Sequence, residues 1–169
     1  MVKEAVMSSL GQAEHQKVES TVNLGLNAYI PNDYIVDENL KIYTYKQIYN
    51  LDSVKRGREI RDELQEKFGS VPVEVQNLIF TSIIRSFAEK AGLSSVVRQG
   101  DVLILRFSKD VTVDSVMLID LLSETKGKAE IRNGKETYLR YGHKTGRRYD
   151  DFLQFLKSLS DCISISNQV

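Results

Sequence analysis

The chain has 169 residues, and its 23 Lys and Arg residues balance 23 Asp and Glu residues to a formal net charge of zero. With 41% hydrophobic and 27% charged residues, its composition is that of a folded globular protein rather than a disordered or fibrous one. The single cysteine excludes an intrachain disulfide scaffold, and a chain of this length needs neither a disulfide nor a metal to form a stable core. The balanced charge also argues against bulk affinity for nucleic acid.

Neither a membrane segment nor a secretion signal is predicted. The sequence lacks a run of about 18 apolar residues. Its N-terminus carries Glu4 between short apolar stretches and does not have the pattern of a signal peptide. We therefore expect a protein of the reducing cytoplasm with no membrane partner.

The first 17 residues have the pattern of the end of a helix followed by a linker. Residues 2–10 are helical in pattern, Gly11 is a helix stop, and residues 12–17 are polar. This pattern fits a native helical N-terminus and a domain cut from a longer chain equally well.

A strand and a helix are predicted next. Apolar and polar residues alternate over 22–30, which predicts a half-buried strand that Pro31 ends. A helix is predicted over 37–51. Its larger side chains lie near one stripe, formed by Leu40, Tyr43, Gln47, Ile48 and Leu51.

Two further helices follow. Ser53 can cap a helix that runs to Phe68 and stops at Gly69. Pro72 suits the first position of another helix, which Gly92 closes. The spacing of the apolar residues in this last helix predicts a core helix. These residues are Val75, Leu78, Ile79, Ile83, Phe87 and Ala91.

Two β-hairpins with interspersed helices are predicted in the second half. Gln99-Gly100-Asp101 connects the strands of the first hairpin, and Asn133-Gly134 those of the second. Between them, Asp110 or Thr112 caps a short helix over 113–123. A final helix runs over 150–161, and the tail at 162–169 is expected to fray. A strand, three helices and two hairpins together predict the α+β class.

Few residues have the spacing of a catalytic, metal or cofactor site. Neither His15 nor His143 has the helical spacing of metal ligands, so both are predicted to be surface residues. Cys162 lacks a basic neighbour and is predicted to be a small core or interface residue. Lys144-Thr145 resembles the end of a phosphate loop, but His143 stands where that loop needs glycine. We predict no catalytic residue, no metal and no cofactor.

One segment has a marked charge asymmetry. Residues 126–149 include eight basic and two acidic residues, a net charge of +6, with three interleaved tyrosines. Such a hairpin and loop can contact phosphates and stack on bases. The simpler interpretation is a solvated hairpin that docks on an acidic partner or on the acidic remainder of its own chain. The candidate nucleic-acid contacts are Arg140, Lys144, Arg147 and Arg148.

Three ordered motifs resemble a known family. They are Asn-Ala-Tyr-Ile-Pro-Asn-Asp-Tyr-Ile at 27–35, Leu-Lys-Ile-Tyr-Thr-Tyr-Lys at 40–46 and Glu-Leu-Gln-Glu-Lys-Phe-Gly at 63–69, followed by Pro72 and Asn77-Leu78. In this order and spacing they resemble the C-terminal domain of bacterial transcription-repair coupling factors. The resemblance covers about 20–92, and 93–161 follow only the family's order of elements.

The resemblance implies a regulatory domain without catalysis. Family members pack this α+β domain on a UvrB-like N-terminal module of the same chain, where it masks the surface that recruits UvrA in transcription-coupled nucleotide excision repair. The ATP-dependent motor that moves on DNA and the module that binds RNA polymerase lie elsewhere in the parent. By this resemblance, residues 1–17 correspond to the end of a helicase-region helix plus a linker, and residues 18–169 to the regulatory domain.

The interface residues implied by the resemblance are Glu63, Glu66 and Lys67. At about 100° per residue, they form a strip on the predicted third helix that the core does not need. The simpler interpretation, from the sequence alone, is a solvated face on which carboxylates alternate with Arg and Lys. The core stripe of that helix is Gly57, Ile60, Leu64 and Phe68. The family usually has Asp and Arg where this chain has Glu66 and Lys67, and lysine cannot form a bidentate pair with a carboxylate.

Overall fold

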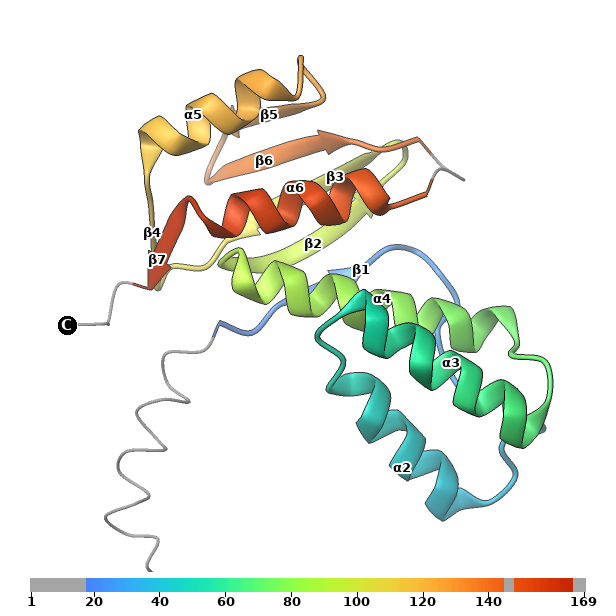
Figure 1. Ribbon diagram of the computed structural model, residues 1–169. Coiled ribbons are helices and arrows are strands. Elements are labelled where there is room, and N and C mark those ends of the chain that lie inside the picture. The colour runs from blue at the N-terminus through green and yellow to red at the C-terminus, as the bar shows by residue number, and fades with distance from the viewer. Residues whose placement is uncertain (1–17, 145–147, 166–169) are drawn as a thin grey trace, which may run out of the picture. The chain divides into compact units, whose positions relative to one another are not determined.

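The computed structural model describes residues 18–144 and 148–165 (Figure 1). Its mixture of helices and antiparallel strands confirms the α+β class. The elements are β1 (Thr21–Asn23), α2 (Glu38–Tyr49), α3 (Val54–Phe68), α4 (Val73–Lys90), β2 (Leu93–Gln99), β3 (Val102–Phe107), β4 (Val111–Val113), α5 (Ser115–Glu124), β5 (Ala129–Asn133), β6 (Thr137–Gly142), α6 (Asp150–Ser160) and β7 (Ile163–Ile165).

The chain forms two compact units. The helical unit comprises residues 22–87, and the sheet unit comprises the described residues at 18–21 and those from Ala88 onward. The helix and linker predicted for 1–17 lie outside the described residues.

Capping residues mark the starts of α2 and α3, and those of α3 are the predicted ones. The side chain of Asp37 accepts a hydrogen bond from the Leu40 amide at the start of α2, and Ser53 accepts one from the Arg56 amide at the start of α3. Gly69 follows α3 with a φ of 86°, a conformation that favours glycine.

α3 and α4 approach closely at Gly57. A Cβ atom at this position would lie 2.6 Å from Cδ1 of Ile83, which is too close for any real contact. Glycine therefore permits the packing that buries Ile60 and Leu64 of α3 and Ile79 of α4.

The strand predicted over 22–30 is wrong beyond its first residues. β1 ends at Asn23, and Gly25 then takes a positive φ of 69°. The following backbone pairs with helices instead of a neighbouring strand. The amide of Tyr29 donates to the Glu74 carbonyl, and the amide of Ile30 donates to the Tyr45 hydroxyl at 2.8 Å.

The stripe predicted on α2 is also wrong in part. Ile48 is buried as predicted, but Leu40 and Tyr43 are 47% and 57% exposed. Thr44 takes the buried place, and its hydroxyl donates to the Leu40 carbonyl at 2.8 Å, which satisfies the polar group. An apolar part of α2 is consequently left uncovered in the helical unit.

In the sheet unit, β2, β3, β6 and β5 are neighbouring strands of an antiparallel sheet in that order. Both predicted hairpins are confirmed, with Gln99 opposite Val102 and Asn133 opposite Thr137. α6 crosses one face of the sheet (Figure 1). There the ring of Phe152 lies 5.0 Å from that of Tyr141, and the buried side chains of this layer form the core.

Two predictions for the sheet unit are wrong. The helix predicted over 113–123 begins later, at Ser115, because Val111–Val113 forms the strand β4, and Asp114 rather than Asp110 or Thr112 caps it. The expected frayed tail contains β7, which pairs antiparallel with β4. Gly92 allows this pairing, because a Cβ atom there would clash with the side chains of Val111 and Ile163. Residues 166–169 lie outside the described residues.

Candidate protein-interaction surface

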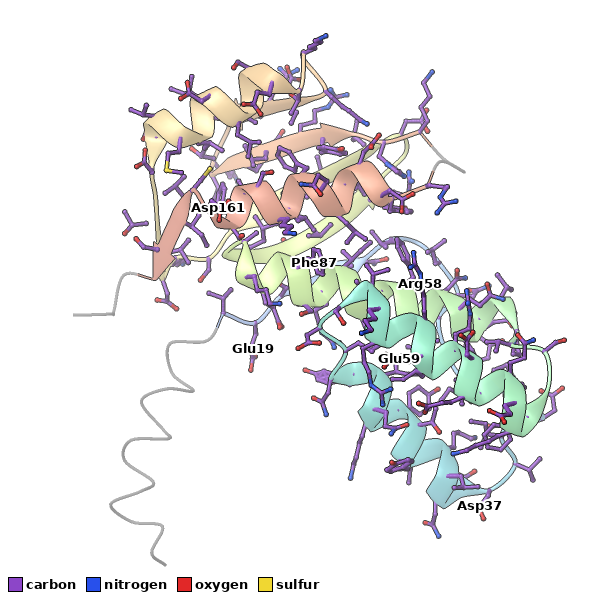
Figure 2. All side chains as sticks on the ribbon, in the orientation of Figure 1. Glu19, Asp37, Arg58, Glu59, Phe87 and Asp161 are labelled. Carbon is purple, nitrogen blue, oxygen red and sulfur yellow. The ribbon has the colours of Figure 1, made fainter. Side chains whose placement is uncertain are left out.

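The three candidate interface residues lie on the exposed side of α3. Glu63, Glu66 and Lys67 are all exposed, while Gly57, Ile60 and Leu64 of the same helix are buried. The period of the helix therefore places the charged strip as predicted. Figure 2 shows the side chains of this helix and labels Arg58 and Glu59 on it.

Glu63 already has a partner within α3. Nη1 of Arg56 lies 3.2 Å from Oε1 of Glu63 and 3.2 Å from Oε2 of Glu59. Hydrogen bonds to Glu63 and then Glu59 raise the pKa of the Arg56 guanidinium above its usual value. These side chains form a small surface network in which one arginine bridges two carboxylates.

Glu66 and Lys67 differ from Glu63 in this respect. Within the described part of the chain, neither side chain makes a hydrogen bond or an ion pair. They present one negative and one positive charge side by side on an exposed helix. An approaching surface can pair with them without first breaking an existing contact.

The C-terminal end of α3, next to these charges, is fixed by Tyr34. The Tyr34 hydroxyl lies 3.2 Å from the Leu64 carbonyl oxygen and 2.9 Å from that of Gly69. Its ring also packs against Phe68 with a centroid distance of 5.8 Å. Phe68, predicted to be core, is half-buried. The motif at 27–35 thus supports the candidate surface, a role that sequence reasoning did not find.

Lys41, which stands where the family usually has arginine, makes internal contacts. Its Nζ contacts Oδ1 of Asn32 and lies 3.6 Å from Oε1 of Glu38. The side chain is only 11% exposed. Lys41 therefore joins α2 to the preceding segment rather than extending the charged strip.

Several basic residues of the sheet unit pair with carboxylates. Glu130 accepts from both Arg132 and Arg140, and the Arg132 hydrogen bond is the main reason why the pKa of Glu130 is lowered. Nε of Arg148 lies 2.9 Å from Oδ2 of Asp150.

A cavity of about 900 Å³ in the sheet unit contains several of these basic residues. Lys128, Arg140, Lys144 and Arg148 line it, but so do Asp101, Asp150 and Asp151. This mixture favours the docking interpretation of the basic hairpin over phosphate binding. Arg147 lies outside the described residues.

The prediction that His143 lies at the surface is wrong. His143 is 4% exposed, and its ring stacks on that of Tyr149 with a centroid distance of 4.0 Å. Arg98 donates to both the His143 carbonyl and the Tyr149 hydroxyl, at 3.1 Å each. His143 is therefore part of the packing beside the basic loop. His15 lies outside the described residues.

Cys162 is a core residue, as predicted. It is 3% exposed, and burial raises the pKa of its thiol, which disfavours the reactive thiolate. Among the residues that the structure describes, no group of three or more His, Cys, Asp or Glu side chains could hold a metal ion. None of the described helices is long and apolar enough to cross a membrane.

The described part of the chain is an α+β domain whose candidate site is a charged, exposed helix. The TRCF domain family matches residues 24–118. The transcription-repair-coupling factor of Staphylococcus aureus (strain USA300) is 29% identical over 176 residues, an alignment that covers 100% of this chain and 14% of that protein. The Bacillus subtilis (strain 168) protein of the same name is 27% identical over 95% of this chain and 14% of its own length.

A solved structure agrees with these relatives. The crystal structure of the C-terminal domain of a transcription-repair coupling factor superimposes with a TM-score of 0.68 at 26% identity, covering 86% of this chain and 92% of that one. This chain belongs to the TRCF domain family and corresponds to the C-terminal domain of transcription-repair coupling factors. It spans about 14% of the length of these curated relatives.

Proposed function

We propose that this chain is a non-catalytic regulatory domain that holds its parent coupling factor in an inhibited state. It packs on a UvrB-like module of the same parent chain and masks the surface that recruits UvrA. The parent is a cytoplasmic, ATP-dependent DNA translocase that contacts RNA polymerase through its other modules. The observation that carries the proposal is the exposed strip of Glu63, Glu66 and Lys67, in which Glu66 and Lys67 have no partner among the described residues.

The chemistry of the strip suits a contact that must open. Interfaces between domains of one chain tend to be small and polar. Exposed ion pairs contribute roughly 0–1 kcal/mol each, and more where the pair is desolvated. A few such pairs hold two modules together while leaving the interface reversible. A largely apolar interface would release far more slowly.

The two substitutions in the motif set the geometry of the contact. Lys67 supplies a point charge with three donors, whereas arginine would supply a planar fork. Glu66 carries its carboxylate one methylene further from the backbone than aspartate. We therefore expect single ion pairs of variable geometry with the parent module rather than a bidentate ion pair.

The test is charge reversal in the parent protein. Glu66→Arg should raise the affinity for UvrA, because the inhibitory contact is weakened. Arg58→Glu is the matched control: Arg58 is exposed on α3 at a different angle and makes no hydrogen bond or ion pair with the described residues. Equal UvrA affinity in both variants and the wild type, with unchanged thermal stability, would overturn the proposal.

Nucleic-acid binding through the basic segment is the second candidate. The observation in its favour is the cavity lined by Lys128, Arg140, Lys144 and Arg148, and the acidic residues beside it weigh against it. Submicromolar DNA binding by this chain, with a steep salt dependence lost in Arg147→Ala/Arg148→Ala, would favour this second function.

A further inference from the structure

The helical unit contains a groove that the proposed regulatory contact does not use. It lies between α2 and α4 and has a volume of about 470 Å³. The residues that shape its walls are Tyr45, Lys46 and Tyr49 of α2 and Leu78, Ser82 and Arg85 of α4. None of the described residues lining it is acidic.

Arg85 is held in place within this groove. Its guanidinium carbon lies 3.8 Å from the centroid of the Tyr49 ring, and Nη2 donates to the Tyr49 carbonyl. A guanidinium has five N–H donors, and within the described residues no carboxylate pairs with it. The stacking fixes the plane of a cation whose other donors remain available.

Lys46 adds a second charge of the same sign. It is exposed and lines the groove, and it makes no ion pair with a described residue. A carboxylate entering the groove would meet two positive charges and no competing acid. The groove is therefore complementary to an anion, and charges of one sign in a cleft reinforce each other's field.

The apolar part of the surface extends beyond the groove. Its floor includes the buried Ile48. Ile42 is 51% exposed and Tyr49 is 57% exposed, and their spacing of seven residues puts them on the same face of α2. A ligand that covers both side chains must be elongated. A polypeptide segment meets this requirement and a small anion does not.

We propose that the groove between α2 and α4 binds an acidic segment of a partner protein. A carboxylate of the segment pairs with Arg85 and Lys46, and a neighbouring apolar side chain packs between Tyr49 and Leu78. Ile42 extends the contact along α2. This contact is separate from the α3 strip, so either proposal can fail without the other.

The test uses this 169-residue chain and a random-peptide phage library. The expected result is enrichment of peptides in which Asp or Glu adjoins Leu, Ile or Phe. Fluorescence anisotropy then measures one enriched peptide against variants. Lys46→Glu should weaken its binding at least tenfold, and Ile42→Ser several-fold, because both side chains are exposed and their replacement leaves the fold intact.

Three further variants test which residues of the helical unit the peptide contacts. Arg85→Lys keeps the charge but loses the planar fork, so binding should weaken by less than with Lys46→Glu. Glu66→Arg and Arg58→Glu on α3 should leave the affinity unchanged. The proposal is overturned if no peptide is enriched, if the enriched peptides are basic or purely apolar, or if Lys46→Glu and Ile42→Ser bind as the wild type does.

Discussion

Arg56 binds Glu63 along the surface of α3, with Nη1 3.2 Å from Oε1. The pair divides the candidate strip into Glu63, which already has a partner within the helix, and Glu66 and Lys67, which have no partner among the described residues. A partner that uses Glu63 must compete with Arg56. The larger effect on regulation is therefore expected from Glu66 and Lys67.

Gly57→Ala should destabilise the helical unit through its contact with Ile83. The new Cβ would lie 2.6 Å from Cδ1 of Ile83, and overpacking of this kind costs roughly 1–3 kcal/mol. Alanine recovers about 1 kcal/mol of helix propensity, so we expect a net loss of about 1 kcal/mol in urea unfolding.

A double-mutant cycle identifies the cause of that loss. Ile83→Val removes the clashing methyl group, so Gly57→Ala should cost less in that background. Gly134→Ala, where a Cβ atom meets nothing closer than 4.0 Å, should change stability by less than about 0.5 kcal/mol. An equal cost of Gly57→Ala in both backgrounds would show that the close approach to Ile83 is not its source.

Tyr34→Phe should loosen the end of α3 while preserving the ring contact with Phe68. The hydroxyl that lies within hydrogen-bonding distance of the Leu64 and Gly69 carbonyl oxygens is lost, at a cost of about 1 kcal/mol. Hydrogen exchange should accelerate in the last turn of α3 and much less at its first turn. Equal exchange rates in the last turn of α3 in the wild type and the variant would contradict this role of Tyr34.

Tyr141 should make stability depend on alkaline pH. Burial, with a smaller contribution from Asp151, raises the pKa of Tyr141 to about 12. The folded pKa of Tyr141 therefore exceeds the unfolded value of about 10. Below about pH 10 the phenol is neutral in both states, and the stability of the fold is at its full value. The contribution of the neutral phenol is lost as the pH rises from about 10 towards 12.

The comparison with Tyr141→Phe isolates this effect. Phenylalanine keeps the packing against Phe152 and Phe155 but does not ionise. The free energy of unfolding of the wild type should fall relative to that of the variant by an amount on the order of 2 kcal/mol across this range. Parallel pH profiles for the two proteins would show that Tyr141 ionises alike in the folded and unfolded states.

Cys162 should be unreactive in the folded chain. The residue is 3% exposed, and burial, followed by the charges of Asp161 and Asp114, raises the pKa of its thiol. The raised pKa lowers the fraction of thiolate, which is the form that reacts with Ellman's reagent, and burial limits the reagent's access. We expect labelling at least a hundredfold slower in buffer than in denaturant, and comparable rates would place Cys162 at an accessible surface.

The features predicted correctly from the sequence are those that depend on residues close together in the chain. Ser53 caps its helix because it needs only a backbone amide three residues away, and Asn133-Gly134 turns between strands that are adjacent in the chain. The exposure of Glu66 likewise follows from the helical period alone. Such features depend on the local sequence and not on how distant segments pack.

Features that depend on distant partners were not predicted. β4 and β7 pair across about fifty intervening residues, and each strand has only three residues, too short for a pattern. The segment after β1 pairs with helices through Tyr29 and Ile30 rather than continuing as a strand. In the candidate site, the support of α3 by Tyr34 was missed for the same reason, because it joins positions thirty residues apart.

The accessibility of position 66 tests the regulatory account most directly. A Glu66→Cys variant is treated with a maleimide, once in this isolated chain and once in the full-length parent, and labelling at position 66 is followed by mass spectrometry. An Arg58→Cys variant in both backgrounds serves as the control for reactivity. The account predicts that position 66 is labelled at least tenfold more slowly in the parent than in the isolated chain, while position 58 is labelled alike in both. Equal rates at position 66 would contradict the claim that this surface of α3 is covered in the parent.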